Sequence, residues 1–248
     1  NAPKYGRGKF GQGGEDNKPR IWQYLIEKKF SNQAAAGVIG NLMVESGTNC
    51  DPTIGEIGQD APRTAEEALT KNGGFGICQW TANYNGESIS PERVKGLIAM
   101  AKAENKPTTD LYVQLDFAMK ELGERKECLD GLNKAKTATE ACDVWLEYFE
   151  GVPSTPSRGE REKNAEDILK QYGNGQTNTS TIDLGALTSQ LPGAGPGGGG
   201  APHNVGLMGA LTDAAALLMD ALQMFDQGSQ QSSSVAGAPT GKNGDTLA

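Results

Sequence analysis

The chain has 248 residues, of which 22% are charged, and its formal net charge is −8. Binding to a phosphate backbone requires clustered positive charge, so this acidic balance argues against nucleic acid as a partner. The most apolar run, residues 205–225, is interrupted by Asp213 and Asp220, and we therefore expect no transmembrane segment.

Composition separates a helix-forming part of the chain from glycine-rich flanks. Residues 1–17 are typical of a glycine-rich N-terminal arm, and helical patterns fill residues 18–173. After them we expect a Gly/Pro-rich linker over 174–204, an amphipathic helix over 205–227 and a flexible tail over 228–248. No secretory signal opens the chain, and Asn at its first position in place of Met indicates a processed chain or a piece of a longer one.

Helix signals begin near Pro19, whose fixed φ suits a first turn. Ser31 is typical of the N-cap of a second helix, which Gly47 is expected to end. The buried faces of these two helices are expected to be formed by Ile21, Tyr24 and Leu25 and by Ala35, Val38, Ile39 and Leu42.

Between residues 49 and 81 the helical period weakens, apart from a short helix predicted near residues 65–71. Capping boxes satisfy backbone N–H groups at a helix start with two side chains three residues apart, and two such patterns occur late in the chain. We expect helices to open at Ser90-Pro91, at Thr109-Asp110, at Thr137-x-x-Glu140 and at Ser157-x-x-Glu160.

The predicted helix over 205–227 carries a heptad-like pattern. Its spacing fits either a coiled-coil seam that joins copies of the chain in a homo-oligomer, or a helix packed on its own domain. The apolar residues alternate by four and three and are Leu207, Leu211, Ala214, Leu218, Ala221 and Phe225.

Glu45 lies near the end of a small-residue apolar segment, residues 34–47. A carboxyl group held against apolar neighbours stays protonated near neutral pH and can act as a general acid. A Glu just ahead of Ser-Gly is also typical of a solvated last helical turn. A second segment, residues 73–80, combines glycine-rich backbone with an amide and an indole, which suits a sugar-cleaving site.

These two segments are followed by Gln114, by Tyr148-Phe-Glu-Gly-Val-Pro153 and by Arg161. That order resembles the phage tail lysozyme family, a branch of the lysozyme-like superfamily that includes goose-type lysozymes and lytic transglycosylases. The resemblance covers about residues 21–172. It implies a mainly α, lysozyme-like α+β fold with about seven helices and a small β-hairpin, and it makes residues 18–173 the catalytic domain.

The resemblance implies that Glu45 is the catalytic acid. A hydrolase also needs a second carboxylate, and Glu56 and Asp60 lie in the loop region where goose-type relatives place theirs. In a lytic transglycosylase the C6 hydroxyl of the muramic acid attacks instead, and no second carboxylate is required. Glu45-Ser46 followed by Gly76-Ile-Cys-Gln79 also resembles the transglycosylase pattern, so both chemistries stay open.

Substrate contacts are implied for Ser46, Gly76, Gln79, Trp80 and Tyr148. Gln79 would bind N-acetyl or hydroxyl groups, or serve only as a loop amide, while Gly76 would let the backbone approach the sugar. Trp80 would stack on a sugar or fill the core, and Tyr148 would place its hydroxyl beside the acid or pack within its helix.

Other pairings are expected to be structural. Glu150 and Arg161 are predicted to form a buried ion pair between the last two helices. No CxxC pair occurs, and the single histidine, His203, lies in the predicted linker, so we expect no metal site and no cofactor. Two disulfides or four free buried thiols are both compatible with Cys50, Cys78, Cys128 and Cys142.

The function implied by the resemblance is a peptidoglycan muramidase that cleaves MurNAc-GlcNAc bonds. It would be carried in the virion with other proteins of a phage tail tip and would thin the host cell wall for DNA delivery. Two alternatives are a structural tail-tip or plug protein in which the domain is a spacer, and a component of a conjugation or secretion apparatus.

Overall fold

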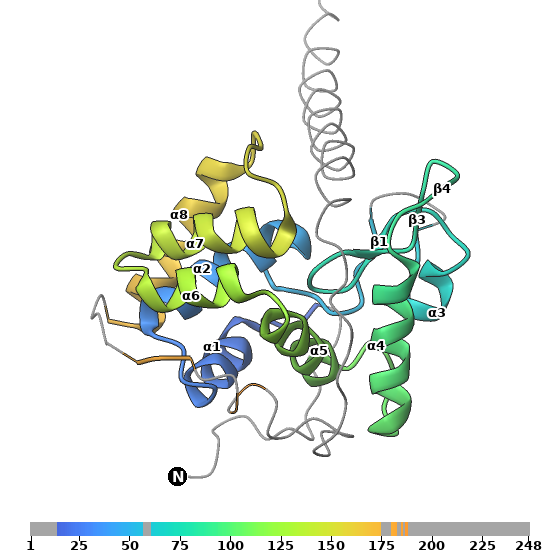
Figure 1. Cartoon of the computed structure of the whole chain (residues 1–248), viewed down its shortest axis with the longest axis horizontal. Helices are drawn as coiled ribbons and strands as arrows, with labels where there is room; N and C mark the ends of the chain where they lie inside the picture. Colours follow the sequence, from blue (N-terminus) through green and yellow to red (C-terminus); the bar gives the residue numbers. More distant parts are fainter. Residues whose placement is uncertain (1–13, 57–60, 175–179, 183–184, 186, 188–248) are drawn as a thin grey trace, which may run out of the picture.

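The computed structural model describes residues 14–56, 61–174, 180–182, 185 and 187. Asp60, His203, most of the predicted arm and the whole predicted helix over 205–227 lie outside these residues. Within them the chain is mainly helical, as expected, and has two pairs of short antiparallel strands where one small hairpin was expected (Figure 1).

Eight α-helices occur in the described residues, where the sequence predicts about seven. A π-helical turn, η1 (Leu146–Glu150), continues the seventh of them directly. The helices are α1 (Lys18–Glu27), α2 (Asn32–Glu45), α3 (Ala65–Ala68), α4 (Pro91–Ala103), α5 (Leu111–Gly123), α6 (Lys126–Lys134), α7 (Ala138–Trp145) and α8 (Arg158–Tyr172).

Three of the predicted N-caps form through side-chain oxygens. Ser31 accepts from the backbone of Ala34, Asp110 accepts from two backbone N–H groups, and Thr137 accepts from the backbone of Glu140. The capping box predicted at Ser157 is wrong, because the Ser157 side chain makes no cap bond although α8 begins beside it. Its hydroxyl instead accepts a hydrogen bond from a side chain of the same helix.

Four short strands form two hairpins between α3 and α4. β1 (Gly74–Phe75) pairs with β2 (Trp80–Thr81), and β3 (Asn83–Tyr84) pairs with β4 (Glu87–Ser88), all antiparallel. The second hairpin turns at Asn85-Gly86, whose φ angles are both positive at 50° and 83°. Asn-Gly is the strongest short-range signal for such a turn, so the sequence carries a marker for a hairpin that was not predicted separately.

Helix α2 is buried on every side from Gln33 to Leu42, and α7 and α8 make the most extensive contacts with it. The close approach requires glycine at two positions. A Cβ on Gly37 would lie 2.5 Å from the backbone nitrogen of Cys142 on α7, and a Cβ on Gly40 would lie 2.7 Å from the backbone oxygen of Arg161 on α8. Small residues in α2 therefore fix how closely α8 can pack beside it.

The helices divide into two groups (Figure 1). α1, α2, α6, α7 and α8 gather on one side, α3, α4 and the strands on the other, and α5 lies between them. Contacts follow this division, because α2 packs on α1, α7 and α8, while α4 packs on α3, β2 and α5. The loop that follows α2 leads from the first group to α3 in the second.

The hydrophobic core continues beyond residue 173, where the sequence places the end of the compact domain. Ile182 and Leu187 are buried at 3% and 0% exposure. Asn133 on α6 holds the backbone of Ile182 through two hydrogen bonds, and the Leu187 carbonyl accepts from the side chain of Lys28. These two aliphatic side chains dock a segment that otherwise consists largely of Gly, Ser, Thr and Asn.

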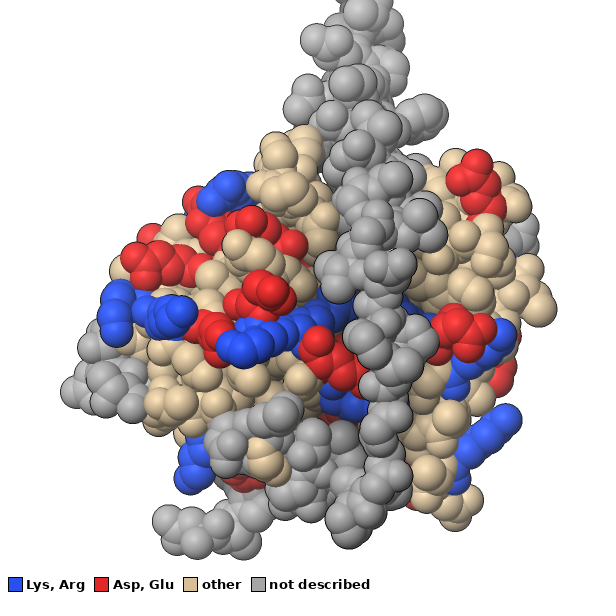
Figure 2. All heavy atoms as spheres, in the orientation of Figure 1, with Lys and Arg blue, Asp and Glu red and all other residues tan. Residues whose placement is uncertain are grey.

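Charges of both signs are interspersed over the described part of the helical face shown in Figure 2. Ion pairs one helical turn apart occur on the described helices, as between Lys163 and Asp167 and between Lys126 and Asp130. Over the described part of the chain, no helix combines the length and apolarity needed to cross a membrane.

Candidate active site

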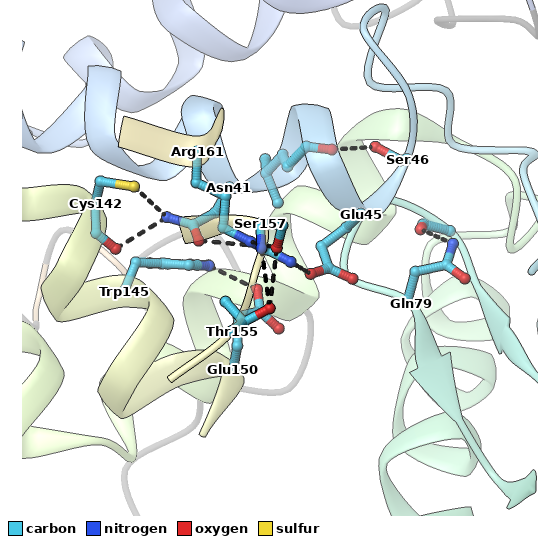
Figure 3. A network of polar contacts seen from close by, with 12 residues as sticks. Asn41, Glu45, Ser46, Gln79, Cys142, Trp145, Glu150, Thr155, Ser157 and Arg161 are labelled. Carbon is cyan, nitrogen blue, oxygen red and sulfur yellow. Dashed lines mark hydrogen bonds and ion pairs between the residues drawn. The ribbon is translucent and has the colours of Figure 1, made fainter. Parts of the chain in front are cut away.

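Glu45 is the last residue of α2, and its side chain is 15% exposed. Its Oε1 atom accepts a 2.6 Å hydrogen bond from Nη2 of Arg161, which is only 5% exposed (Figure 3). The carboxyl group therefore faces a guanidinium and a partly open side, not apolar neighbours alone. The prediction that Arg161 pairs with Glu150 is wrong, because Arg161 forms its ion pair with Glu45.

Arg161 is held in place by two further hydrogen bonds. Its Nε donates to Ser157 Oγ at 3.0 Å, and its Nη1 donates to Asn41 Oδ1 at 3.2 Å. The Asn41 amide in turn donates to the backbone oxygens of Gly37 and Cys142, each at 3.0 Å. This network joins α2, α7 and α8 and orients the guanidinium towards Glu45 (Figure 3).

Glu150 is a second carboxyl group beside Arg161 (Figure 3). It ends the π-helical turn, and its Oε1 accepts a 2.8 Å hydrogen bond from the indole N–H of Trp145. Burial and the negative charge of Glu45 raise the pKa of Glu150 to about 7, against the opposing charge of Arg161. Glu45 is therefore ion-paired with Arg161, whereas Glu150 is hydrogen-bonded to Trp145 and interacts with Arg161 through its charge.

The turn between β1 and β2 brings Gln79 opposite Glu45 (Figure 3). Gln79 has a φ of 45°, and its Nε2 donates to the backbone oxygen of Gly76 at 3.0 Å. Gly76 has a φ of 79°, and a Cβ there would lie 2.7 Å from Oε1 of Gln114. The close approach that requires glycine at position 76 is therefore an approach to Gln114 inside the protein.

Gln114 lies at 0% exposure beneath this turn. Its Oε1 accepts from the backbone N–H of Ile77 at 2.9 Å, and its Nε2 donates to the carbonyls of Pro52 and Thr108 at 2.7 and 2.8 Å. One side chain of α5 thus ties together the loop after α2 and the turn that carries Gln79. This role explains why Gln114 occurs together with the segments of Glu45 and Gln79 in the order noted in the sequence.

Glu56 also lies close to the β1–β2 turn. Its Oε2 accepts a 3.1 Å hydrogen bond from the backbone N–H of Gly74, and its own N–H donates to the Gly74 carbonyl at 3.0 Å. Burial raises the pKa of Glu56, the Gly74 N–H opposes this, and the charge of Glu45 raises it further. Glu56 is therefore near enough to Glu45 for the two charges to interact, whereas Asp60 lies outside the described residues.

Ser46 and Trp80 are both fully buried. The Ser46 hydroxyl donates to the carbonyl of Leu42 at 2.7 Å and so satisfies the end of α2. The Trp80 indole donates to Oε2 of Glu121 at 2.9 Å, and Glu121 also binds Arg93. Of the two roles that the sequence offers for Trp80, this placement favours the core role, because the ring has no exposed face for a sugar.

Tyr148 lies on the π-helical turn and is 43% exposed. The charge of Glu147, a hydrogen bond to the same residue and a smaller contribution from Glu127 raise the pKa of Tyr148. The two carboxylates that raise the pKa of the Tyr148 hydroxyl, Glu147 and Glu127, are exposed on the turn and on α6. The residue of the turn that lies beside Arg161 is Glu150.

All four cysteines are free and buried, so no disulfide joins any two of them. Burial raises the pKa of Cys50, Cys128 and Cys142 to about 12, which keeps these thiols protonated and unreactive. No group of three or more His, Cys, Asp or Glu side chains in the described residues is arranged to hold a metal ion.

Sequence reasoning missed one residue of this site, Asn41, and assigned the wrong partner to another, Glu150. Asn41 had a signal, because a polar residue at 0% exposure inside a helix of small apolar residues requires hydrogen-bond partners. The signal for Glu150 is weaker. It lies in the Tyr148–Pro153 stretch, but that stretch does not reveal which residue it contacts. The partner of Arg161 could not be predicted from the neighbouring sequence, because it lies on another helix.

The sequence matches the family model described as phage tail lysozyme over residues 16–172. The matched range covers more than half of the chain and includes Glu45, Gln79, Glu150 and Arg161. A comparison with curated proteins found no match. Lysozymes are glycosidases that degrade peptidoglycan, and the family match supports this class of activity. By this match, which spans all eight described helices, the chain belongs to the phage tail lysozyme family.

Proposed function

We propose that the chain is a muramidase that hydrolyses the MurNAc-GlcNAc bond of peptidoglycan. The observation that supports this most directly is the position of Glu45, a partly exposed carboxyl group at a helix end between Arg161 and Gln79 (Figure 3). A carboxyl group of this kind can protonate the oxygen that leaves when a glycosidic bond breaks.

In the proposed reaction the proton of Glu45 passes to the glycosidic oxygen while positive charge develops on the sugar ring. Glu45 is left as a carboxylate. The Arg161 guanidinium, already oriented towards it by Ser157 and Asn41, stabilises this charge without having to reorganise. Arg161 therefore favours the product of the proton transfer.

Glu56 is the proposed second carboxylate. It comes from the loop that follows α2, its carboxyl is fixed by the Gly74 N–H, and its charge interacts with that of Glu45. As a base it would take a proton from the attacking water, whose oxygen bonds to the sugar C1. Asp60 stays a second candidate for this role.

Gln79 is the proposed substrate-binding residue of the β1–β2 turn. One N–H of its amide is engaged by the Gly76 carbonyl, and the amide keeps further hydrogen-bonding capacity for N-acetyl or hydroxyl groups. Three further residues are proposed to support the site without direct contact to the sugar, by keeping the end of α2 and the β1–β2 turn in place: Ser46, Gly76 and Trp80. Tyr148, from its exposed position, would contact only a more distant part of the glycan.

The mass of the muropeptides released by the full chain tests the reaction type. Hydrolysis predicts products that end in reducing muramic acid. Products that end in 1,6-anhydro-muramic acid would show a lytic transglycosylase and overturn the hydrolase assignment.

The same assay applied to Glu56→Gln and Asp60→Asn tests the second carboxylate. We expect Glu56→Gln to lose activity by about a hundredfold or more, within the usual contribution of a general base, and Asp60→Asn to retain it. Glu87→Gln, on the exposed strand β4, is a matched control, because it also removes one negative charge from the group formed by α3, α4 and the strands. The reverse result would move the role to Asp60.

We further propose that the enzyme is a component of a phage tail tip. This location is supported by the family to which the chain belongs. Mass spectrometry of purified virions and of isolated tails tests it, with the chain expected in both. Its absence from virions, together with its presence in a conjugation or secretion complex, would support the alternative location.

A further inference from the structure

The Glu45–Arg161 ion pair raises a chemical question, and the answer proposed below rests on the proposed glycosidase function. A general acid must carry a proton when the substrate arrives. In the structure, however, the Glu45 carboxyl accepts a short hydrogen bond from a guanidinium, which is the arrangement of a carboxylate. The site therefore needs a way to keep a proton available to Glu45.

Glu150 has the position to supply one. It lies beside the same guanidinium, and its hydrogen-bond donor is the neutral indole of Trp145. The single positive charge of Arg161 is already matched by Glu45 at 2.6 Å. A second carboxylate at this place would be desolvated beside a like charge without a cation of its own, which favours its protonated form.

The other charged groups around Glu150 are largely engaged elsewhere. Arg93 on α4 forms two hydrogen bonds with Glu121, and Arg125 donates to the Phe149 carbonyl and lies 4.0 Å from Glu121. The titratable groups whose charges interact with Glu150 come from several elements and are Glu45, Cys78, Arg93, Arg125, Cys128 and Arg161.

We propose that Glu150 is a positioning residue for the acid: Glu45 and Glu150 share one proton and the one Arg161 guanidinium, so that a form with the proton on Glu45 stays populated at neutral pH. In one arrangement Arg161 binds the Glu45 carboxylate while Glu150 is protonated. In the other Arg161 serves the Glu150 carboxylate and Glu45 carries the proton. Two interacting carboxyls titrate as a pair, and the one-proton form contains both arrangements.

The proton count closes over the reaction. Glu45 gives its proton to the glycosidic oxygen and becomes the carboxylate that Arg161 binds in the structure. The pair has then lost its shared proton, while Glu56 has gained one from the attacking water. Release of the Glu56 proton to solvent and uptake of one proton from solvent by the pair restore the starting state before the next turnover. Burial and the Glu45 charge raise the pKa of Glu150 to about 7, so this recovery is favourable up to neutral pH.

The pH profile of kcat/KM for peptidoglycan cleavage by full-length Glu150→Gln tests the proposal. In the wild type we expect activity to decline above about pH 7, as the shared proton is lost. In Glu150→Gln the alkaline limb should move down by about one unit or more, so that activity at pH 7 falls about tenfold while activity at pH 5 is retained. The control, Glu147→Gln, removes an exposed carboxyl from the same turn and should leave the profile unchanged. Superimposable profiles for Glu150→Gln and the wild type would overturn the proposal.

A second measurement needs neither activity nor a folded Glu150 variant. NMR titration of the full chain with 13C-labelled glutamate carboxyls should show one group with a midpoint near the Glu150 pKa of about 7. In Glu45→Gln that midpoint should fall, because the Glu45 charge is gone and the positive charge of Arg161 then acts on Glu150 without a competing carboxylate. An unchanged midpoint would refute proton sharing. A wild type without peptidoglycan cleavage would instead refute the proposed function, and the titration would still decide the sharing.

Discussion

Glu45 accepts a 2.6 Å hydrogen bond from Arg161, although the two residues are 116 positions apart in the chain. The bond exists because α8 packs against α2 at Gly40, where a Cβ would collide with the backbone oxygen of Arg161 itself. The helix that carries the acid therefore also fixes the cation beside it. In α2, the small residue Gly40 thus sets the distance to α8 and so determines which cation lies beside the Glu45 carboxyl.

Replacing Arg161 with Met should destabilise the protein by about 3 kcal/mol, because Glu45 and Asn41 lose a shared partner in a mostly buried network. Arg161→Lys should cost less, since it keeps the charge, although a compact ammonium lacks the planar fork through which the guanidinium reaches Ser157, Asn41 and Glu45. Denaturant-induced unfolding measures both. Equal stability of Arg161→Met and the wild type would show that the network contributes little.

Trp80→Phe separates a core role from a sugar-stacking role. Loss of the indole N–H bond to buried Glu121 should lower the free energy of unfolding by about 2 kcal/mol. The KM for peptidoglycan should stay unchanged, because the ring is fully buried. A raised KM at wild-type stability would instead indicate that Trp80 contacts the sugar.

Stability should depend on pH through Glu150. Its pKa rises from 4.5 to about 7 on folding, so between these values the folded state holds a proton that the unfolded state has lost. The contribution of Glu150 to the free energy of unfolding should therefore be complete below pH 4.5 and decrease as pH rises towards 7. Glu150→Gln should remove this part of the decrease. Thermal unfolding across this pH range measures it, and parallel curves for the two proteins would contradict the account.

The segment around Leu187 should contribute to stability although it follows the last helix. Leu187→Asp should cost about 2 kcal/mol, because a fully buried side chain would have to leave the core. Thr181→Asp adds the same charge at an exposed position of the same segment and should have little effect. Equal effects of the two substitutions on thermal unfolding would show that this docking is unimportant.

Local signals predicted the helices that have local caps. Ser31, Asp110 and Thr137 each bond to backbone N–H groups within three residues, so their side chains could be interpreted from sequence alone. Helix α6 begins after Arg125 without a side-chain cap, and no prediction marked its start. Element starts are predictable where the stabilising contact is itself local.

The site was only partly predictable for the same reason. Glu45 and Gln79 could be selected from their own segments, but the partner of Arg161 depends on how α2 and α8 cross. Glu150 was the nearer carboxyl in sequence and was chosen incorrectly, whereas the tertiary packing pairs Arg161 with Glu45. The docking of Ile182 and Leu187 could not be predicted from sequence, because it depends on distant contacts with Asn133 and Lys28.

The release of reducing ends from peptidoglycan by full-length Glu45→Gln tests the central claim most directly. Gln can still accept a hydrogen bond from Arg161, so the fold should persist, but the side chain has no proton to donate as an acid. We predict that release falls to the background level while the far-UV circular dichroism spectrum matches the wild type. Release at the wild-type rate by the folded variant would contradict the assignment of Glu45 as the acid.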